Sequence, residues 1–453
     1  MFKKLFSKPI FRRLFLGGGG AVENAFQNAP ITLASPIFNV GMGLSPVLIG
    51  IAVALPRIWE ILLDPWIGVK SDRFRSRWGK RTPFIFWGTL ISALLFALIW
   101  WVPVGWSLFA KGVWLIISLL LFYTAYSFFA VPYAALTIEQ TEEGPDRVGV
   151  MVIRTAFATL SGIALNWLYW LAQRDCFENA VVGMRWVGLG FGLLIGLFGL
   201  LPLLVLQRSR DPVPSAVEPK QEASSFKPLL KMPILQCLII ALLGIMVSFT
   251  LVGQLGFYTF AYFGCAGDLK LAALVGAQKA TLTSILGILA CPVVSWLSKK
   301  MGKQNTLQGL LLLGGIGSVC TWWTITPVNP YYSVSSDLCV MIGLVGFWSL
   351  MPAFLGDVSD LYQAKTGESC QGQLAAIYGV AVKIGASSAL LLTGYVLIFC
   401  DFPKEITPES MREPLRSMRL LYAAIPGIGI AIAMGALHYF YKIYHKEINK
   451  KES

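Results

Sequence analysis

The chain has 453 residues, of which 56% are hydrophobic and only 13% are charged. Soluble domains average about 25% charged residues, and a soluble fold cannot cover this much apolar surface, so the composition predicts a polytopic membrane protein. The formal net charge of +13 does not indicate nucleic-acid binding, because the basic residues gather in short loops and termini between apolar runs, as orientation signals do.

Apolar runs long enough to cross a bilayer recur along the whole chain, since about 20 helical residues suffice. We predict about twelve spans, at 16–40, 46–69, 83–104, 112–138, 149–173, 182–206, 233–262, 271–297, 305–326, 334–356, 372–399 and 420–442. The glycines at 17–20 lack the Lys-Ser/Thr of a phosphate-binding loop, and we interpret them as positions where helices pack closely.

Basic residues alternate between the loops and therefore predict the orientation. The segment before the first span and the loops 70–82, 207–232 and 298–304 carry five, six, five and three Lys/Arg, whereas the loops after spans one, three and nine carry none, one and none. We expect both termini in the cytoplasm, an uncleaved N-terminal segment, and insertion in a bacterial cytoplasmic (inner) membrane.

The longest polar segment, 207–232, is rich in Pro and Ser and predicts a flexible cytoplasmic linker. It separates an N-terminal bundle, 1–206, from a C-terminal bundle, 233–453. A faint repeat supports this division, because Gly79-Lys80-Arg81 after the second span is similar to Gly302-Lys303 after the eighth. We predict an all-α membrane protein of two pseudo-symmetric six-helix bundles, the layout of major facilitator transporters, whose solute site lies between the halves at mid-membrane.

Three charged residues lie inside the second apolar run: Arg57, Glu60 and Asp64. A charged side chain near the bilayer centre costs roughly 2.5–3.5 kcal/mol on insertion scales, so it needs a partner or a purpose. Glu60 and Asp64 are four residues apart and share one face of a helix, which favours a cation or proton site. An ion pair between Arg57 and Glu60 is the alternative for these two residues.

Other spans also carry isolated polar residues. Glu23 and Asn24 lie in the first span, Arg154 in the fifth, and Trp348 and Lys383 in the tenth and eleventh. Each has two interpretations. Glu23 and Asn24 either contact a cation or a sugar, or form a solvated polar pair at a helix end. Arg154 and Lys383 either contact the hydroxyl groups of the solute, or neutralise a carboxylate on another helix of the bundle. Trp348 stacks on a sugar ring or packs in the core.

The basic loop after the second span has a further interpretation. Asp72 can accept from an Arg or from a helix N-terminus, and such contacts can break when the two halves rock. We therefore predict a cytoplasmic latch, with simple orientation charge as the alternative. Its residues are Asp72, Arg73, Arg77, Lys80 and Arg81, with Arg57 as a further gating residue.

Several of these residues together resemble a known family. The stretch Arg57-Ile58-Trp59-Glu60, Asp64-Pro65 and Gly68, followed by Ser76-Arg77-Trp78-Gly79-Lys80, is similar to the glycoside–pentoside–hexuronide:cation symporters, typified by the melibiose permease. Asp357-x-x-Asp360 and Lys383-x-Gly385 extend the resemblance over nearly the whole chain. It implies a twelve-span major facilitator fold and sugar uptake coupled to Na+ or H+.

The resemblance also implies roles for single residues. Glu60 and Asp64 match the family's cation-site carboxylates, and four residues match positions that line its sugar cavity: Tyr126, Arg154, Trp348 and Lys383. Asn24 stands where the family has a sugar-binding aspartate, for which the neighbouring Glu23 substitutes. Two positions depart from the family pattern, because Ala130 replaces an aspartate shared by sugar and cation, and Ala134 replaces a tryptophan under the sugar ring.

We therefore predict a secondary active transporter that couples H+ or Na+ to a sugar or glycoside, needs no other cofactor and functions as a monomer. Glutamate at position 60 slightly favours the proton. The apolar cavity left by Ala130 and Ala134 favours an alternative, cation-coupled transport of a lysophospholipid-like amphiphile. We expect no enzyme, because the only histidines are His438 and His445 and the sequence has no metal-binding or nucleophile cluster.

The eight cysteines show no metal-ligand spacing. Three of them, Cys176, Cys265 and Cys400, lie near predicted outer loops, where a disulfide is one alternative to free thiols.

Overall fold

The computed structural model describes residues 9–139, 145–206, 227–367, 370–403 and 412–452, and in these ranges it contains helices and no strand. The chain divides into two compact units, 1–219 and 220–453. Most of the predicted linker 207–232 lies outside the described residues, at 207–226; its last part contains the short helix α9 (Lys227–Leu230). The all-α class predicted from composition is confirmed.

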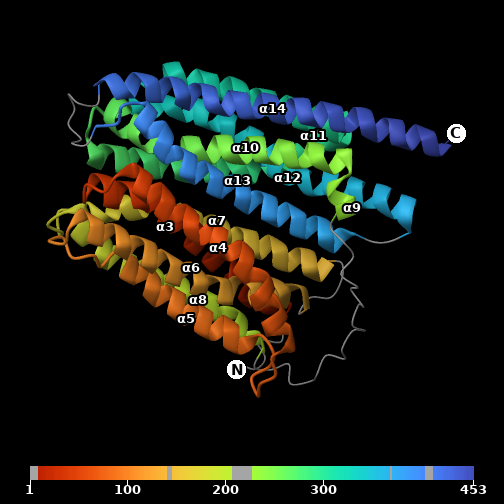
Figure 1. The fold of residues 1–453 in the computed structure, drawn as a ribbon, viewed down its shortest axis with the longest axis horizontal. Coiled ribbons are helices and arrows are strands. Elements are labelled where there is room, and N and C mark those ends of the chain that lie inside the picture. The colour runs from red at the N-terminus through yellow and green to blue at the C-terminus, as the bar shows by residue number, and fades with distance from the viewer. Residues whose placement is uncertain (1–8, 140–144, 207–226, 368–369, 404–411, 453) are drawn as a thin grey trace. The chain divides into compact units, whose positions relative to one another are not determined.

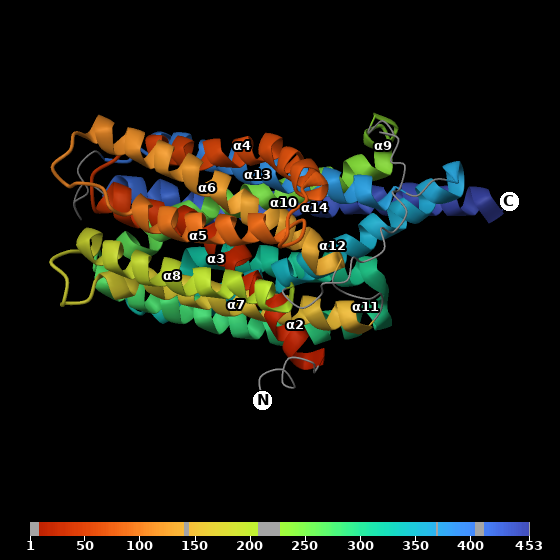
Figure 2. The same ribbon diagram turned by 90° about the horizontal axis from the view of Figure 1, so that it is seen from below.

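The first unit contains seven α-helices within its described residues and one π-helical turn. They are α2 (Pro9–Gly18), α3 (Gly20–Ala34), η1 (Ser35–Val40), α4 (Pro46–Arg73), α5 (Thr82–Ile99), α6 (Leu108–Glu139), α7 (Pro145–Ala172) and α8 (Ala180–Leu206). Helix α3 packs along α7, α4 packs along α6, and α5 contacts both α6 and α8, as Figures 1 and 2 show from two directions.

The second unit is built in a similar way. After α9 it contains α10 (Pro233–Tyr258), the π-helical turn η2 (Thr259–Gly264), α11 (Leu269–Thr324), the 3-10 turn η3 (Pro330–Tyr332), α12 (Ser333–Thr366), α13 (Gln371–Phe399) and α14 (Arg412–Glu452). Helix α11 packs on α12 and α14, and α10 packs on α13 and α14. Fully buried aromatic side chains such as Phe347, Phe354 and Phe440 fill the core between them.

Among the described residues, ten helices are long and apolar enough to cross a membrane, and two features separate this number from the predicted twelve. The first predicted span, 16–40, is divided among α2, α3 and η1, of which α3 has only 15 residues. The eighth and ninth predicted spans lie within the single element α11, which is interrupted at Gly302, where φ is 82°. The count of twelve stays a prediction.

Helix α4, which carries the charged residues of the second predicted span, has clear local boundary signals. The hydroxyl of Ser45 accepts from the backbone N–H of Leu48 at 3.2 Å, and Pro46 at the first helical position needs no intrahelical partner for its nitrogen. Lys70 and Arg73 lie in the last turn, where positive charge complements the helix dipole. Arg57, Glu60 and Asp64 therefore lie on one continuous helix.

Both units carry the same local features at corresponding points of the chain. A π-helical turn follows α3 in the first unit and α10 in the second. Gly79 and Gly302 both have positive φ, 99° and 82°, and each precedes a cation that binds a carboxylate. Arg81 Nη2 lies 2.6 Å from Asp72 Oδ1, and Lys303 Nζ lies 2.7 Å from Asp357 Oδ1.

The cysteines near the predicted outer loops are free thiols, so the alternative of a disulfide among Cys176, Cys265 and Cys400 is not realised. Burial raises the pKa of the Cys265 thiol to about 11 and that of the Cys400 thiol to about 11. Because the thiolate is the reactive form, a raised pKa leaves these two groups protonated and unreactive until the solution becomes strongly alkaline.

We therefore expect a maleimide to label the exposed Cys176 near neutral pH and to leave Cys265 and Cys400 unmodified. Peptide mass mapping of the detergent-solubilised protein measures this. Raising the pH and unfolding the protein should expose the two buried thiols, which serves as the control. Labelling of Cys265 in the folded protein at neutral pH would contradict the burial described here.

Candidate functional site

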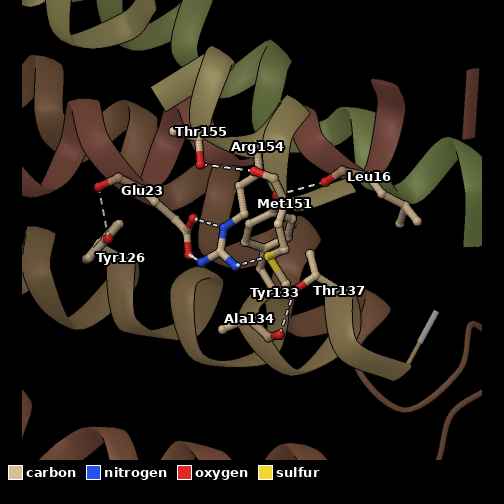
Figure 3. Close-up of polar contacts among 9 residues, drawn as sticks. All are labelled: Leu16, Glu23, Tyr126, Tyr133, Ala134, Thr137, Met151, Arg154 and Thr155. Carbon is tan, nitrogen blue, oxygen red and sulfur yellow. Dashed lines mark hydrogen bonds and ion pairs between the residues drawn. The ribbon is translucent and has the colours of Figure 1, made fainter. Parts of the chain in front are cut away.

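Glu23 on α3 and Arg154 on α7 form a two-pronged ion pair in the first unit (Figure 3). Arg154 Nε donates to Glu23 Oε2 at 2.6 Å, and Arg154 Nη2 donates to Glu23 Oε1. Such fork-like pairs combine charge with fixed geometry. The side chains of Arg154 and Glu23 retain 25% and 19% exposure, so the pair is mostly covered but not sealed.

Tyrosines of α6 surround this pair. The Tyr133 ring lies 5.4 Å from the guanidinium carbon of Arg154, and its hydroxyl donates to the carbonyl of Leu16 at 2.7 Å. The Tyr126 hydroxyl donates to the backbone carbonyl of Glu23 at 3.2 Å (Figure 3). Three helices, α3, α6 and α7, therefore hold the pair in place.

The glycines before Glu23 permit α2 and α3 to approach α7 closely. A Cβ on Gly20 would lie 2.3 Å from the carbonyl oxygen of Arg154, and one on Gly17 would lie 2.6 Å from Ile153. Any larger residue would push the helices apart, so the interpretation of these glycines as packing positions is confirmed.

Asn24 lies beside this pair, at the contact between α3 and α7. Its Nδ2 donates to the carbonyl of Ala158 at 2.7 Å, and its Oδ1 accepts from Asn28 Nδ2 at 2.8 Å. The structure therefore brings together three of the predicted solute residues, Asn24, Tyr126 and Arg154, with Glu23 among them.

Arg57 and Glu60 form the local ion pair that was the alternative to a cation site. Arg57 Nη1 lies 3.0 Å from Glu60 Oε2, and the two side chains are only 5% and 2% exposed. Arg57 Nη2 also donates to the carbonyl of Gln27 and to the Tyr123 hydroxyl at 3.3 Å, and its guanidinium carbon lies 4.3 Å from the Tyr123 ring. The charge of Glu60 is thus balanced within its own helix.

Asp64 lies one turn further along α4 and is half-buried. Arg57, the partner of Glu60 on α4, donates to the carbonyl of Gln27, four residues along α3 from Glu23, and the Tyr123 ring that it contacts lies 6.3 Å from the Tyr126 ring. The predicted cation residues and the predicted solute residues of the first half therefore form one neighbourhood inside the first unit.

Trp348 and Lys383 belong to the second unit. Trp348 on α12 is 39% exposed and meets the edge of Phe347, with ring centroids 5.6 Å apart. Lys383 on α13 is half-buried, and its backbone carbonyl accepts from Ser387 Oγ at 2.8 Å. Their roles toward a solute stay predictions.

The predicted latch contains one ion pair within its loop. Arg81, at the start of α5, is nearly buried and pairs with the exposed Asp72 at the end of α4. The other three predicted latch residues, Arg73, Arg77 and Lys80, have exposed side chains. The pair links neighbouring helices of the first unit.

A half-buried ion pair in the second unit was not predicted. Lys279 Nζ on α11 lies 2.7 Å from Asp337 Oδ2 on α12 and donates a hydrogen bond to Ser333 Oγ at 2.8 Å. The same ammonium group lies 4.1 Å from the centre of the Phe260 ring. The available signal was a single cation in the eighth predicted span and a single acid in the tenth. Within the described residues, no three His, Cys, Asp or Glu side chains are grouped to hold a metal ion.

Apolar helices in two compact units, with buried ion pairs inside the helix bundles, define the class of multi-pass α-helical membrane transporters. The family described as "MFS/sugar transport protein" matches residues 16–445, and the chain belongs to this family. In a solved structure, a bacterial homologue of the human lysosomal transporter Spinster shares the fold with a TM-score of 0.72 at 15% identity, covering 97% of this chain and 99% of that one.

Curated relatives show the range of the family. The "Glucuronide carrier protein homolog" of Escherichia coli K12 is 22% identical over 95% of this chain and 92% of its own length. The "Isoprimeverose transporter" of Lactiplantibacillus pentosus is 22% identical over 88% and 82%. The "Sodium-dependent lysophosphatidylcholine symporter 1-B" of Danio rerio is 23% identical over 86% and 79%.

Proposed function

We propose that this protein is a symporter that couples a cation gradient to the movement of a sugar or glycoside by alternating access. The observation that carries the proposal is the single neighbourhood in the first unit that joins Glu23, Arg154, Asn24 and Tyr126 to the Arg57–Glu60 pair of α4. The family and the names of the sugar-transporting relatives support it. The bacterial cytoplasmic membrane, cytoplasmic termini and a functional monomer belong to the same proposal.

The solute would bind through its hydroxyl groups. Glu23 accepts hydrogen bonds, Arg154 donates them and the Asn24 amide does both, so together they suit a polyol. These groups already have partners inside the protein, because Glu23 and Arg154 pair with each other and Asn24 bonds the Ala158 carbonyl and Asn28. A solute would therefore exchange existing contacts for its own, which makes binding responsive to the geometry of the hydroxyl groups.

The coupling cation would bind at Asp64. Arg57 already balances the charge of Glu60, whereas Asp64 lies one turn further along α4 and is only half-buried, so a cation can reach it from water. One carboxylate suffices for a proton, whereas hard metal cations take several oxygen ligands, so we favour H+ over Na+. A cation shifts the populations of the two alternating-access conformations only if it binds one of them more tightly than the other. That difference in affinity would couple the cation gradient to movement of the solute.

Uptake into proteoliposomes tests this function. Radiolabelled isoprimeverose, a phenyl glucuronide and D-xylose would be offered under an imposed proton gradient, an imposed sodium gradient or neither. We expect a tenfold proton gradient to support up to about tenfold accumulation of at least one sugar, because both correspond to about 1.4 kcal/mol. Uptake that is the same under all three conditions would contradict coupling.

A second candidate function is transport of a lysophospholipid-like amphiphile. The small side chains of Ala130 and Ala134 are half-covered. Ala134 follows Tyr133, whose ring lies 5.4 Å from the guanidinium carbon of Arg154, which favours an apolar wall beside a polar head-group site. The Danio rerio relative supports it. Displacement of bound ligand by lysophosphatidylcholine and by none of the sugars would favour this candidate. We propose no enzymatic activity.

A further inference from the structure

The part of α3 that its neighbours leave uncovered is almost entirely polar. Nine of its fifteen residues are buried. The six residues that remain are Glu23, Asn24, Gln27, Asn28, Ile31 and Thr32, and their spacing places them along one face of a helix. A polar face in a membrane segment is unfavourable against lipid, so this face borders a water-filled path.

Only one end of this polar face belongs to the site described above. The face runs from Glu23 to Thr32, about 13 Å at 1.5 Å per residue, whereas the Glu23–Arg154 pair and Asn24 occupy only its first turn. A single pyranose ring that binds at that first turn would leave the next turn, with Gln27 and Asn28, in contact with water.

The second turn has unused hydrogen-bonding groups. Within the residues that the structure describes, the side-chain amide of Gln27 makes no hydrogen bond, although its backbone carbonyl accepts from Arg57 and Tyr123. Asn28 donates to Asn24, and the Oδ1 of Asn28 accepts from no described group. Half-covered amides with free capacity are the groups that recognise hydroxyls.

Helix α7 adds an amide at the same level. The contacts advance together along α3 and α7: Gly20 faces Arg154, and Asn24 meets Ala158 and Gly162. The two helices therefore run in the same direction, and the turn of α3 that carries Asn28 lies level with the turn of α7 that ends at Asn166. Asn166 Nδ2 donates to the Gly162 carbonyl at 2.8 Å, and its Oδ1 accepts from no described group.

We propose that Gln27, Asn28 and Asn166 form a second hydroxyl-binding subsite next to the Glu23–Arg154 pair, and that it binds the second sugar ring of a two-ring glycoside. The inference rests on the proposed function and narrows its substrate class from sugars in general to disaccharides. The pair and Asn24 hold one ring, and the three amides select solutes that carry another.

The experiment compares isoprimeverose, a disaccharide of xylose and glucose, with its constituent D-xylose. Equilibrium binding of both is measured for the purified wild-type protein and for Gln27→Ala, Asn28→Ala and Asn166→Ala. Gln27→Ala is the sharpest variant, because the lost amide has no partner among the described residues and its removal costs the fold no hydrogen bond. Gln173→Ala is the matched control. Gln173 lies just beyond the end of α7, seven residues after Asn166, and its side-chain amide also donates to a carbonyl four residues earlier, that of Tyr169, at 3.4 Å.

We expect the wild type to bind isoprimeverose about tenfold more tightly than D-xylose, or more. Each subsite variant should lower the affinity for isoprimeverose about fivefold, as the loss of one hydrogen bond predicts, and leave the affinity for D-xylose unchanged. The control should change neither. Equal weakening of both sugars, or unchanged isoprimeverose binding in Gln27→Ala, would overturn the subsite and leave the proposed function standing. Absence of gradient-driven uptake of every sugar would overturn both.

Discussion

Replacing Arg57 with methionine should destabilise the first unit by about 3–5 kcal/mol, the cost of leaving one partner of a buried ion pair uncompensated. Glu60 is only 2% exposed, so water cannot replace the guanidinium. The Tyr123 hydroxyl would still donate to the Gln27 carbonyl, at 3.1 Å, so the contact between α3 and α6 is kept. The loss of stability therefore measures the effect of the unbalanced charge of Glu60. Thermal unfolding in detergent should show a fall in melting temperature on the order of 10 °C.

A double variant separates charge from packing. Methionine at both positions 57 and 60 removes the pair together, and replacing a buried pair with apolar side chains of similar volume is often neutral. We therefore expect the double variant to recover most of the lost stability. If Arg57→Met alone leaves the melting temperature unchanged, Glu60 is solvated in the protein and the burial described here is wrong. If the double variant retains gradient-driven uptake, Glu60 is structural and the coupling role rests on Asp64.

Replacing Asp64 with asparagine should abolish coupling while preserving the fold. Asparagine has nearly the same shape as aspartate but carries no charge and takes up no proton near neutral pH. Under a tenfold proton gradient, accumulation of the transported sugar should fall from about tenfold to about one, because the gradient no longer shifts the two conformations. Exchange of labelled for unlabelled sugar across the membrane should persist, since it needs no net cation movement.

Asp268→Asn is the control for this prediction. Asp268 caps α11, where its Oδ1 accepts from the backbone N–H of Leu271 at 3.0 Å, and asparagine caps helices equally well. The sugar accumulation ratio of the Asp268→Asn variant should equal that of the wild type. Full gradient-driven accumulation by Asp64→Asn would exclude Asp64 as the coupling group and return attention to Glu60 and Glu23.

The positions of most spans followed from the sequence because the requirement that fixes them is local. A segment crosses the bilayer when enough consecutive residues are apolar, and this gave 46–69 for α4, 182–206 for α8 and 372–399 for α13, close to the observed Pro46–Arg73, Ala180–Leu206 and Gln371–Phe399. Local apolarity does not reveal where a helix breaks. The division of the first span and the continuity of α11 up to Gly302 depend on backbone geometry.

Ion-pair partners were predictable only where they are close in sequence. The pair Arg57–Glu60 was one of two alternatives, because residues three apart on a helix are neighbours. The pair Glu23–Arg154 joins residues separated by 131 positions, and Lys279–Asp337 was not predicted at all. In both cases the sequence shows that a buried charge needs compensation and is silent on which helix supplies it.

The sequence by itself determined that this chain is an all-α membrane protein, which segments are apolar enough to span, and which charged residues need an explanation. The tertiary structure alone decided that Glu23 meets Arg154, that Arg57 balances Glu60, and that the uncovered face of α3 is polar over three turns. The physical reason is that the cost of inserting a residue into a bilayer depends on the residue and its immediate neighbours. The group that offsets this cost is chosen by which helix faces pack together.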